Sequence, residues 1–295
     1  MNARLSTVFT FVTGLALAVP LSAAQQPTRI TVLVDAFGAP SALRQDWGFS
    51  ALVEYRGKRI LFDTGNDADI LAHNAKTLGV DLARLDFVVV SHRHGDHTDG
   101  LRHVLKLNPS VRVYVPKDEY FGGPTPAKFY RRGVAALPAH MRYFGGKPPA
   151  QVPHGTPWRH ANFVLVDSVT EVVPGVRLIP ALGHAPGTAD IPELSLTLHT
   201  PTGQVLLVGC SHPGIEEILR AASAPKSPVR LLAGGLHLLA MSETDIERLA
   251  GTLRDKWKVA EIAPGHCSGE PASSTLQKAF GRRYRFAGLG TAIEL

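Results

Sequence analysis

Residues 86–97 read DFVVVSHRHGDH, and this stretch joins an apolar segment to a dense cluster of metal-binding side chains. Residues 86–91 are rich in β-branched and apolar side chains, which predicts a buried strand. The cluster that follows holds His92, His94, Asp96 and His97. Imidazole and carboxylate groups are ligands of divalent transition metals. We therefore expect a rigid strand to deliver a metal site to the edge of a sheet.

The bulk composition is that of an ordinary globular protein with a sizeable core. The chain has 295 residues, of which 44% are hydrophobic and 19% are charged. The net charge is +6, with Lys and Arg spread along the chain, so we expect no nucleic-acid partner. The basic balance is compatible with a small-molecule substrate that carries negative charge.

The first 24 residues have the pattern of a cleaved export signal. Arg4 provides the positive start, Val8 to Val19 is apolar, and Ser22-Ala23-Ala24 suits cleavage after Ala24. A retained membrane anchor is the alternative, but a span needs about 20 apolar residues. We therefore expect a signal peptide at 1–24, a periplasmic or secreted protein, and no stable membrane association after cleavage.

Strand and helix patterns alternate in both halves of the remaining chain, and no linker interrupts residues 25–295. Expected strands cover 29–35, 49–55, 58–63, 86–91, 111–115, 163–166, 176–180, 194–199, 205–209, 229–233 and 259–263. Expected helices cover 69–79, 100–107, 215–222, 243–256 and 273–280. This order predicts one α/β domain in which two sheets lie between layers of helices.

Asp63 ends one of these strands and is followed by Thr64-Gly65. A carboxylate at that place can orient a metal-binding histidine through a hydrogen bond. An ordinary turn that begins with Asp is the alternative. The histidine cluster that follows favours the orienting role.

Residues 116–160 have a different composition, with frequent Pro, Gly, aromatic and basic residues. A long irregular segment within a compact domain is usually functional. We interpret it as a lid or pocket wall in which Arg131, Arg132 and Arg142 could hold an anionic group, with a solvated surface excursion as the alternative.

The two cysteines, Cys210 and Cys267, each lie within two residues of a histidine, His212 and His266. This placement suits the rim of a metal site, while an oxidising compartment would permit a disulfide. The sequence leaves both readings open.

A metal pair that activates water needs ligands from several segments. Two such ions lie about 3.5–4 Å apart and share a water whose pKa falls towards roughly 7. His92 and His94 can point one way from an extended loop, and Asp96 and His97 can turn to a second ion. Further candidates stand at expected strand ends, namely His184, Cys210 or His212, His237 and His266.

The pattern His92-x-His94-x-Asp96-His97 after Asp63-Thr64-Gly65 resembles the metallo-β-lactamase superfamily signature. Later motifs resemble the dihydropterin/ribofuranosylaminobenzene-phosphate-synthase-like branch of that superfamily; they lie at 209–215, 234–238 and 264–269. The resemblance covers the whole mature chain and implies a four-layer αββα sandwich with its site at one edge of the sheets.

The resemblance also implies a ligand set. His92 and His94 would bind the first metal, Asp96, His97 and His266 would bind the second, and Asp63 would hold the loop by hydrogen bonds. Typical members carry a bridging Asp where this chain has Cys210, so His212 is a candidate replacement ligand. Residues 183–187 resemble the usual site of the third histidine, which makes His184 a second candidate, and the two are not exclusive.

These features predict an exported hydrolase with two zinc ions, or Mn²⁺ or Fe, that cleaves an ester, amide or phosphoester bond. Asp96, Asp63 and His237 are the candidate catalytic residues, with His237 as a proton donor or as a packed strand-end residue. The alternatives are a lactonase or β-lactamase-like amide hydrolase, and a non-enzymatic metal or redox-responsive protein that uses its cysteines. The sequence does not indicate an oligomeric state.

Overall fold

The structure is a computed structural model that describes residues 28–39, 41–118, 121, 124–125, 135–150, 152–153, 158, 160–184, 191–222 and 228–295. The predicted export signal at 1–24 lies outside these residues. Within the described ranges, no helix combines the length and the apolar character needed to cross a membrane.

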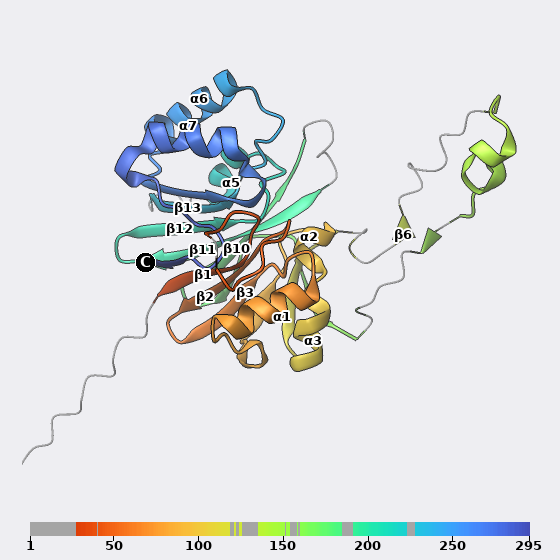
Figure 1. The fold of residues 1–295 in the computed structure, drawn as a ribbon, viewed down its shortest axis with the longest axis horizontal. Helices are drawn as coiled ribbons and strands as arrows, with labels where there is room; N and C mark the ends of the chain where they lie inside the picture. The colour runs from red at the N-terminus through yellow and green to blue at the C-terminus, as the bar shows by residue number, and fades with distance from the viewer. Residues whose placement is uncertain are drawn as a thin grey trace, which may run out of the picture.

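Two mixed sheets form the centre of the molecule (Figure 1). The first has the spatial order β15 (Ala292–Glu294), β1 (Arg29–Val34), β2 (Ser50–Tyr55), β3 (Lys58–Phe62), β4 (Phe87–Val89), β5 (Arg112–Pro116) and β8 (Asn162–Val166). The second has the order β14 (Glu261–Gly265), β13 (Val229–Gly235), β12 (Gly203–Val208), β11 (Pro192–Thr200), β10 (Val176–Leu182) and β9 (Thr170–Val173). A small separate ribbon pairs β6 (Pro124–Thr125) with β7 (Val152–Pro153).

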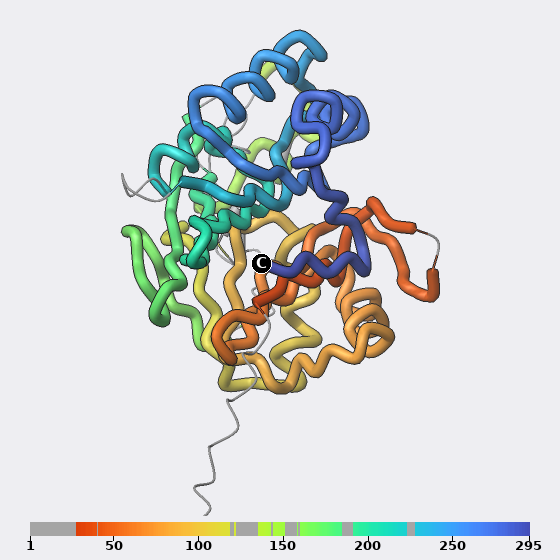
Figure 2. Tube along the Cα trace, turned by 90° about the vertical axis from the view of Figure 1, so that its left-hand side faces the viewer, coloured from red at the N-terminus to blue at the C-terminus, as the bar shows by residue number. Residues whose placement is uncertain are grey.

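Helices cover the outer face of each sheet, so the predicted four-layer αββα sandwich is confirmed (Figures 1 and 2). The first sheet packs against α1 (Ala68–Thr77) and α3 (Leu101–Leu107). The second packs against α5 (Ile215–Ala222), α6 (Glu243–Gly251) and α7 (Glu270–Phe280). The predicted helix at 243–256 is α6 followed by a π-helical turn at Thr252–Lys256. Four-residue α2 (Gly95–Thr98), inside the metal-binding stretch, was not predicted.

The strands read as continuous apolar runs because both of their faces are buried. In β4, Phe87 and Val89 pack between the two sheets. Val88 and the following Val90 pack under the helices. Strand β12 divides its side chains in the same way, with Val205 and Leu207 in the core between the sheets.

The chain direction brings several strand ends to one edge. Strand β3 runs parallel to β4 and β5 in the first sheet, and β12 runs parallel to β13 and β14 in the second. Open α/β sheets bind ligands beyond the carboxyl ends of parallel strands. The loops that leave β3, β4, β12, β13 and β14 carry most of the candidate site residues.

Candidate metal centre

The loop after β4 gathers three imidazole rings. His94 is the residue that precedes α2, and the helix carries His97 back towards His92. The ring centroids of His92 and His97 lie 4.2 Å apart, and those of His92 and His94 lie 4.6 Å apart. His92 and His97 are fully buried, whereas His94 is partly exposed. A metal site formed by these rings would therefore be enclosed at His92 and His97 and open to solvent at His94.

Asp63 holds this loop from the end of β3. Its carboxylate accepts hydrogen bonds from the Ser91 amide at 2.6 Å, the Ser91 hydroxyl at 2.8 Å and His97 Nδ1 at 2.7 Å. The bond to His97 fixes a proton on Nδ1 and leaves Nε2 to face the site. The structure thus places Asp63 as an anchor for a histidine ring rather than as part of an open turn.

Charge and burial oppose each other in this buried pair. Burial raises the pKa of Asp63 above its ordinary value, although His97 and Ser91 counteract that effect. Burial alone would lower the pKa of His97, but the Asp63 carboxylate overrides it and raises that pKa to about 9. In the metal-free protein the His97 ring therefore keeps both of its protons at neutral pH, and a metal ion would take the place of the proton on Nε2.

A second buried carboxylate, Glu193 on β11, holds the loop after β12. Glu193 Oε1 accepts from the amides of Cys210 at 2.9 Å and Ser211 at 2.7 Å. Glu193 Oε2 accepts from the amide of His212 at 2.8 Å and from its Nδ1 at 3.0 Å. Burial raises the pKa of Glu193, but the His212 bond and these amides leave it below the ordinary value. Glu193 fixes the His212 ring as Asp63 fixes His97.

A third carboxylate, Asp35, follows β1 and holds the loop after β14. Asp35 Oδ2 accepts from the His266 amide at 3.0 Å, and Oδ1 accepts from the Phe37 amide at 2.8 Å. Burial raises the pKa of Asp35 to about 6. Neither Glu193 nor Asp35 was among the site residues predicted from the sequence. Asp35 directly follows a strand, as Asp63 does, and this position could have identified it as an orienting carboxylate. Glu193 is a lone acid in an apolar strand, and no such pattern marks it.

Replacing Glu193 with Gln is expected to lower the free energy of unfolding by about 2–3 kcal/mol. The Gln side chain has the same shape, but it lacks the negative charge that strengthens the hydrogen bonds from the buried N–H groups. Glu171→Gln is the matched control, because Glu171 is exposed and accepts a hydrogen bond from the Gly175 amide. That control is expected to change stability by less than about 0.5 kcal/mol. Denaturant unfolding of metal-stripped protein measures both, and equal changes would contradict the anchoring role.

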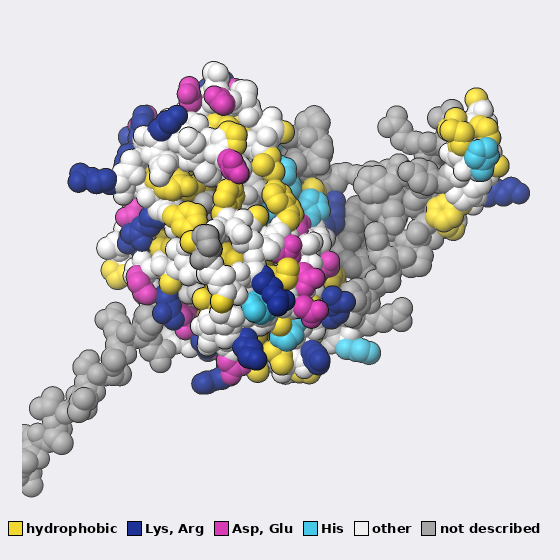
Figure 3. All heavy atoms as spheres, viewed as in Figure 1, with side chains coloured by type: hydrophobic (Ala, Val, Ile, Leu, Met, Phe, Trp, Pro, Cys, Tyr) yellow, Lys and Arg dark blue, Asp and Glu magenta, His cyan; other side chains and the backbone are white. Residues whose placement is uncertain are grey.

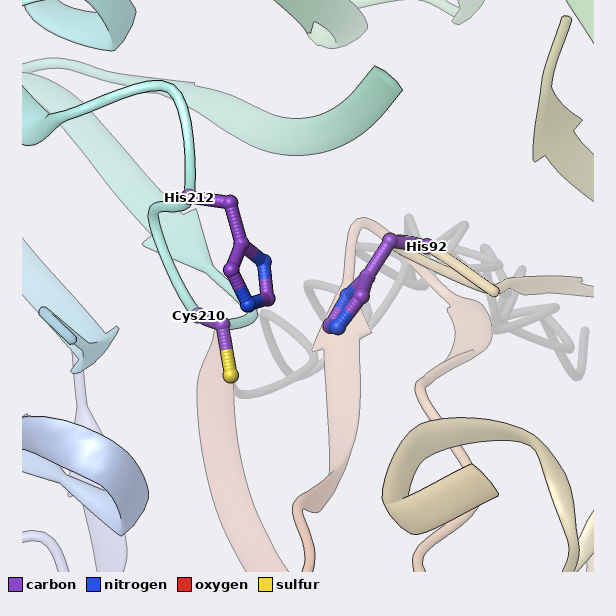
Figure 4. A group of neighbouring side chains, drawn as sticks. All are labelled: His92, Cys210 and His212. Atoms are coloured by element: carbon purple, nitrogen blue, oxygen red, sulfur yellow. The ribbon is translucent and has the colours of Figure 1, made fainter. Parts of the chain in front are cut away.

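Among the described residues, three groups of ligand atoms converge on the sulfur of Cys210. They comprise His92, Cys210 and His212; His97, Cys210 and His266; and Cys210, His237 and Cys267, each with its ligand atoms within 4.8 Å of one another. Figure 4 shows the first group, with Cys210 and His212 on one loop facing His92 on another. In the second group, His97 Nε2 lies 3.2 Å from both Cys210 Sγ and His266 Nε2.

This donor set fits a metal ion. Asp63 and Glu193 accept hydrogen bonds from the Nδ1 atoms of His97 and His212, so Nε2 is the atom of each ring that is left to bind a metal ion. Buried nitrogen and sulfur atoms that face one another at hydrogen-bond distance need a proton or a metal ion between them. Nitrogen and sulfur are the donors that zinc prefers.

His94 and Asp96 border these groups. His94 Nδ1 lies 3.0 Å from His92 Nε2, and burial lowers the His94 pKa to about 4, which favours the neutral ring that a metal needs. Asp96 Oδ2 lies 3.4 Å from His266 Nε2 and 3.8 Å from His97 Nε2. The ligand roles of His94 and Asp96 stay predictions that this geometry supports.

The structure separates the two candidates for the third histidine. His212 is buried beside His92, with ring centroids 4.5 Å apart. His184 is exposed just after β10 and belongs to none of the three ligand groups found among the described residues. The geometry therefore favours His212, which the sequence could not choose over His184.

His237 lies at the mouth of the site. Its side chain is exposed, and its ring centroid lies 4.5 Å from that of His212. Histidine side chains come to the surface at the end of the sandwich near α2, beside hydrophobic ones (Figure 3). A substrate could therefore reach His237 from solvent.

The cysteines are buried and carry free thiols rather than a disulfide. Burial raises the pKa of Cys210 well above its ordinary value. Burial acts on Cys267 in the same direction, but hydrogen bonds from Cys210 and His237 lower its pKa well below the ordinary value. The two thiols thus have different proton affinities inside one cluster.

The predicted lid is only partly described. Arg131 and Arg132 lie outside the described residues, and the segment 135–150, which holds Arg142, stands apart from the sandwich (Figure 1). A lid over the site stays a prediction.

Comparisons with known proteins agree with the fold. A family model described as Metallo-beta-lactamase superfamily matches residues 43–266. The chain is similar to the 7,8-dihydropterin-6-methyl-4-(beta-D-ribofuranosyl)-aminobenzene-5'-phosphate synthase of Methanocaldococcus jannaschii, with 27% identity over 276 residues, 85% of this chain and 90% of the relative. It is also similar to the uncharacterised protein MJ0448 of that organism, with 25% identity over 252 residues, 84% of this chain and 94% of the relative.

A solved structure shares the architecture. It is described as a metal-dependent hydrolase of the beta-lactamase superfamily, and the superposition has a TM-score of 0.70 with 27% identity. The match covers 91% of this chain and 99% of that chain. The resemblance inferred from the motifs is thus confirmed at the level of sequence and of fold.

Proposed function

The chain belongs to the metallo-beta-lactamase superfamily, and from this premise we propose that it hydrolyses an ester, amide or phosphoester bond with metal ions held at the strand ends. One observation carries the proposal: the Cys210 sulfur belongs to two groups of ligand atoms that each contain two histidines. His92 and His212 form the first group with it, and His97 and His266 form the second. If two ions were bound, each group would hold one of them, and Cys210 would belong to both groups.

The donor chemistry supports zinc as the resident metal, with two ions per chain. Imidazole nitrogen and thiolate sulfur match its preferences better than those of Mn²⁺, which favours oxygen ligands. When bound, the ions supply Lewis acidity that makes water more acidic and polarises the bond to be cleaved.

The chain's own residues supply orientation and proton transfer. Asp63 and Glu193 hold the rings of His97 and His212 with Nε2 towards the site. Asp96 is partly exposed beside His266, so its Oδ2 can accept a proton from the attacking water. The exposed ring of His237 can donate a proton to the leaving group from the solvent side.

The test is a substrate panel on zinc-loaded and chelated protein. The panel contains carboxylic esters, lactones, β-lactam amides and phosphoesters, each in neutral and anionic forms. The phosphate in the name of the M. jannaschii relative is the reason to include phosphate-bearing compounds. We expect turnover of at least one class that chelation abolishes and zinc restores. Equal turnover in chelated protein would contradict the proposal, and a lactone or β-lactam preference would decide for the alternative hydrolase classes.

We also propose export, which is supported by the charge and apolar pattern of residues 1–24. The expected mature protein begins at Gln25. N-terminal sequencing of the protein recovered from the source cell checks this, and an uncleaved N-terminus on that protein would contradict it.

A further inference from the structure

We propose that Cys210, His237 and Cys267 form a binding site for one thiophilic metal ion, separate from the two histidine groups except for the shared Cys210. Their ligand atoms lie within 4.8 Å of one another. This group offers two sulfurs and one imidazole, whereas each histidine group offers one sulfur and two imidazoles. Thiolate ligands select soft and borderline ions over hard ones. The inference does not depend on hydrolysis, and while an ion is bound here His237 would be a ligand and would not donate a proton to a leaving group.

Hydrogen bonds between loops hold these ligands in place. The Leu238 amide donates to the Cys267 carbonyl at 3.2 Å, and the Leu236 amide donates to Ser268 Oγ at 3.1 Å. The residues that flank His237 are thus tied to Cys267 and its neighbour. Ser211 Oγ donates to the Gly235 carbonyl at 2.8 Å, which ties the loop of Cys210 to β13. The three ligands therefore come from three loops that are bonded together.

The backbone at Gly235 and His237 is shaped to fit the two sulfur atoms and the imidazole of this site. A Cβ atom on Gly235 would lie 2.7 Å from Cys267 Sγ and 2.4 Å from the Gly209 carbonyl oxygen, so only glycine leaves room for the thiol. His237 has a φ of 52°, a left-handed conformation that a histidine rarely adopts. Such strain persists where surrounding structure enforces it, commonly at functional sites. Here the strained residue directs its ring towards the two sulfurs.

Exposure distinguishes this group from the other two. Both sulfurs are buried, with Cys210 at 3% and Cys267 at 2% exposure, while His237 is exposed. The members of both histidine groups are all buried. An ion can therefore enter past His237 and reach two sulfurs whose negative charge, once they are deprotonated, matches a divalent ion.

The test adds one equivalent of Cd²⁺ to the metal-stripped full-length protein and counts the sulfur ligands by X-ray absorption. The wild-type protein is expected to show two sulfurs per ion, and Cys267→Ser is expected to show one. His237→Ala is expected to keep two sulfurs but to bind Cd²⁺ at least tenfold more weakly. His199→Ala is the matched control, because His199 is also exposed but lies on β11, and its affinity is expected to be unchanged.

One sulfur or none in the wild-type protein would overturn the proposal, and so would an unchanged count in Cys267→Ser. The wild-type count is decisive even where Cys267→Ser does not fold. Two sulfurs with no hydrolysis of any substrate in the panel would leave this site standing and remove the proposed function. Zinc-dependent hydrolysis together with one sulfur per Cd²⁺ would support the proposed function and overturn the proposed thiophilic site.

Discussion

Replacing Asp63 with alanine is expected to lower the free energy of unfolding of the metal-stripped protein by about 3–5 kcal/mol, as for other buried charge partners. The carboxylate is fully buried and accepts three hydrogen bonds, so its removal leaves the Ser91 amide and His97 Nδ1 without an acceptor. The His97 ring then loses the contact that directs Nε2 to the site. Denaturant titration measures the stability change, and isothermal titration with zinc measures the accompanying loss of affinity.

Asp86→Ala is the matched control for Asp63→Ala. Asp86 precedes β4 and accepts from Lys58 Nζ at 2.7 Å and from the Arg59 amide at 2.9 Å, in a partly exposed position. We expect a cost below about 1 kcal/mol for this surface contact and no change in zinc affinity. If the two variants lose similar stability, or if Asp63→Ala binds zinc as tightly as the wild type, Asp63 does not anchor the site.

Replacing Cys210 with serine is expected to cause the largest loss of metal affinity of any single substitution at the site. Its sulfur belongs to every ligand group found among the described residues, and serine keeps its size but stays protonated near neutral pH. The loss of zinc affinity is expected to exceed the roughly 10–100-fold typical of residues that only orient a ligand. Turnover is expected to fall to the uncatalysed rate. Metal analysis after dialysis and rate measurements check both.

Cys210→Asp is the companion variant. A carboxylate is a zinc ligand and can bridge two ions, so this change is expected to retain more zinc and more turnover than Cys210→Ser. If Cys210→Ser binds zinc as tightly as the wild type and hydrolyses substrate at the same rate, the shared sulfur has no role. The proposed arrangement of two ions is then wrong.

The architecture and half of the site followed from the sequence because their signals are local. Residues 86–97 contain the strand, its burial and four candidate ligands within one short stretch. Asp63 was found because an acid at the end of a strand is a recognisable local pattern. The continuous apolar runs predicted strands that are buried on both faces, as in a sandwich with helices outside.

The remaining site residues depend on contacts that spacing does not encode. Cys210 meets His97 across 113 positions of sequence, so only the pairing of the two sheets reveals it as a shared ligand. Glu193 stands alone in the apolar strand β11, where alternation alone does not show whether it faces solvent or a loop. The fold places it under Cys210 and His212, where three amides and an imidazole satisfy its charge.

The most direct test of the central claim is a titration of metal-stripped protein with zinc, in which turnover of a substrate from the panel and bound zinc per chain are measured together. We predict that turnover is absent at the start, rises with bound zinc and reaches its maximum as two ions per chain are bound. Turnover at full rate in the metal-free protein, or zinc that binds fully without any turnover of the panel, would contradict it.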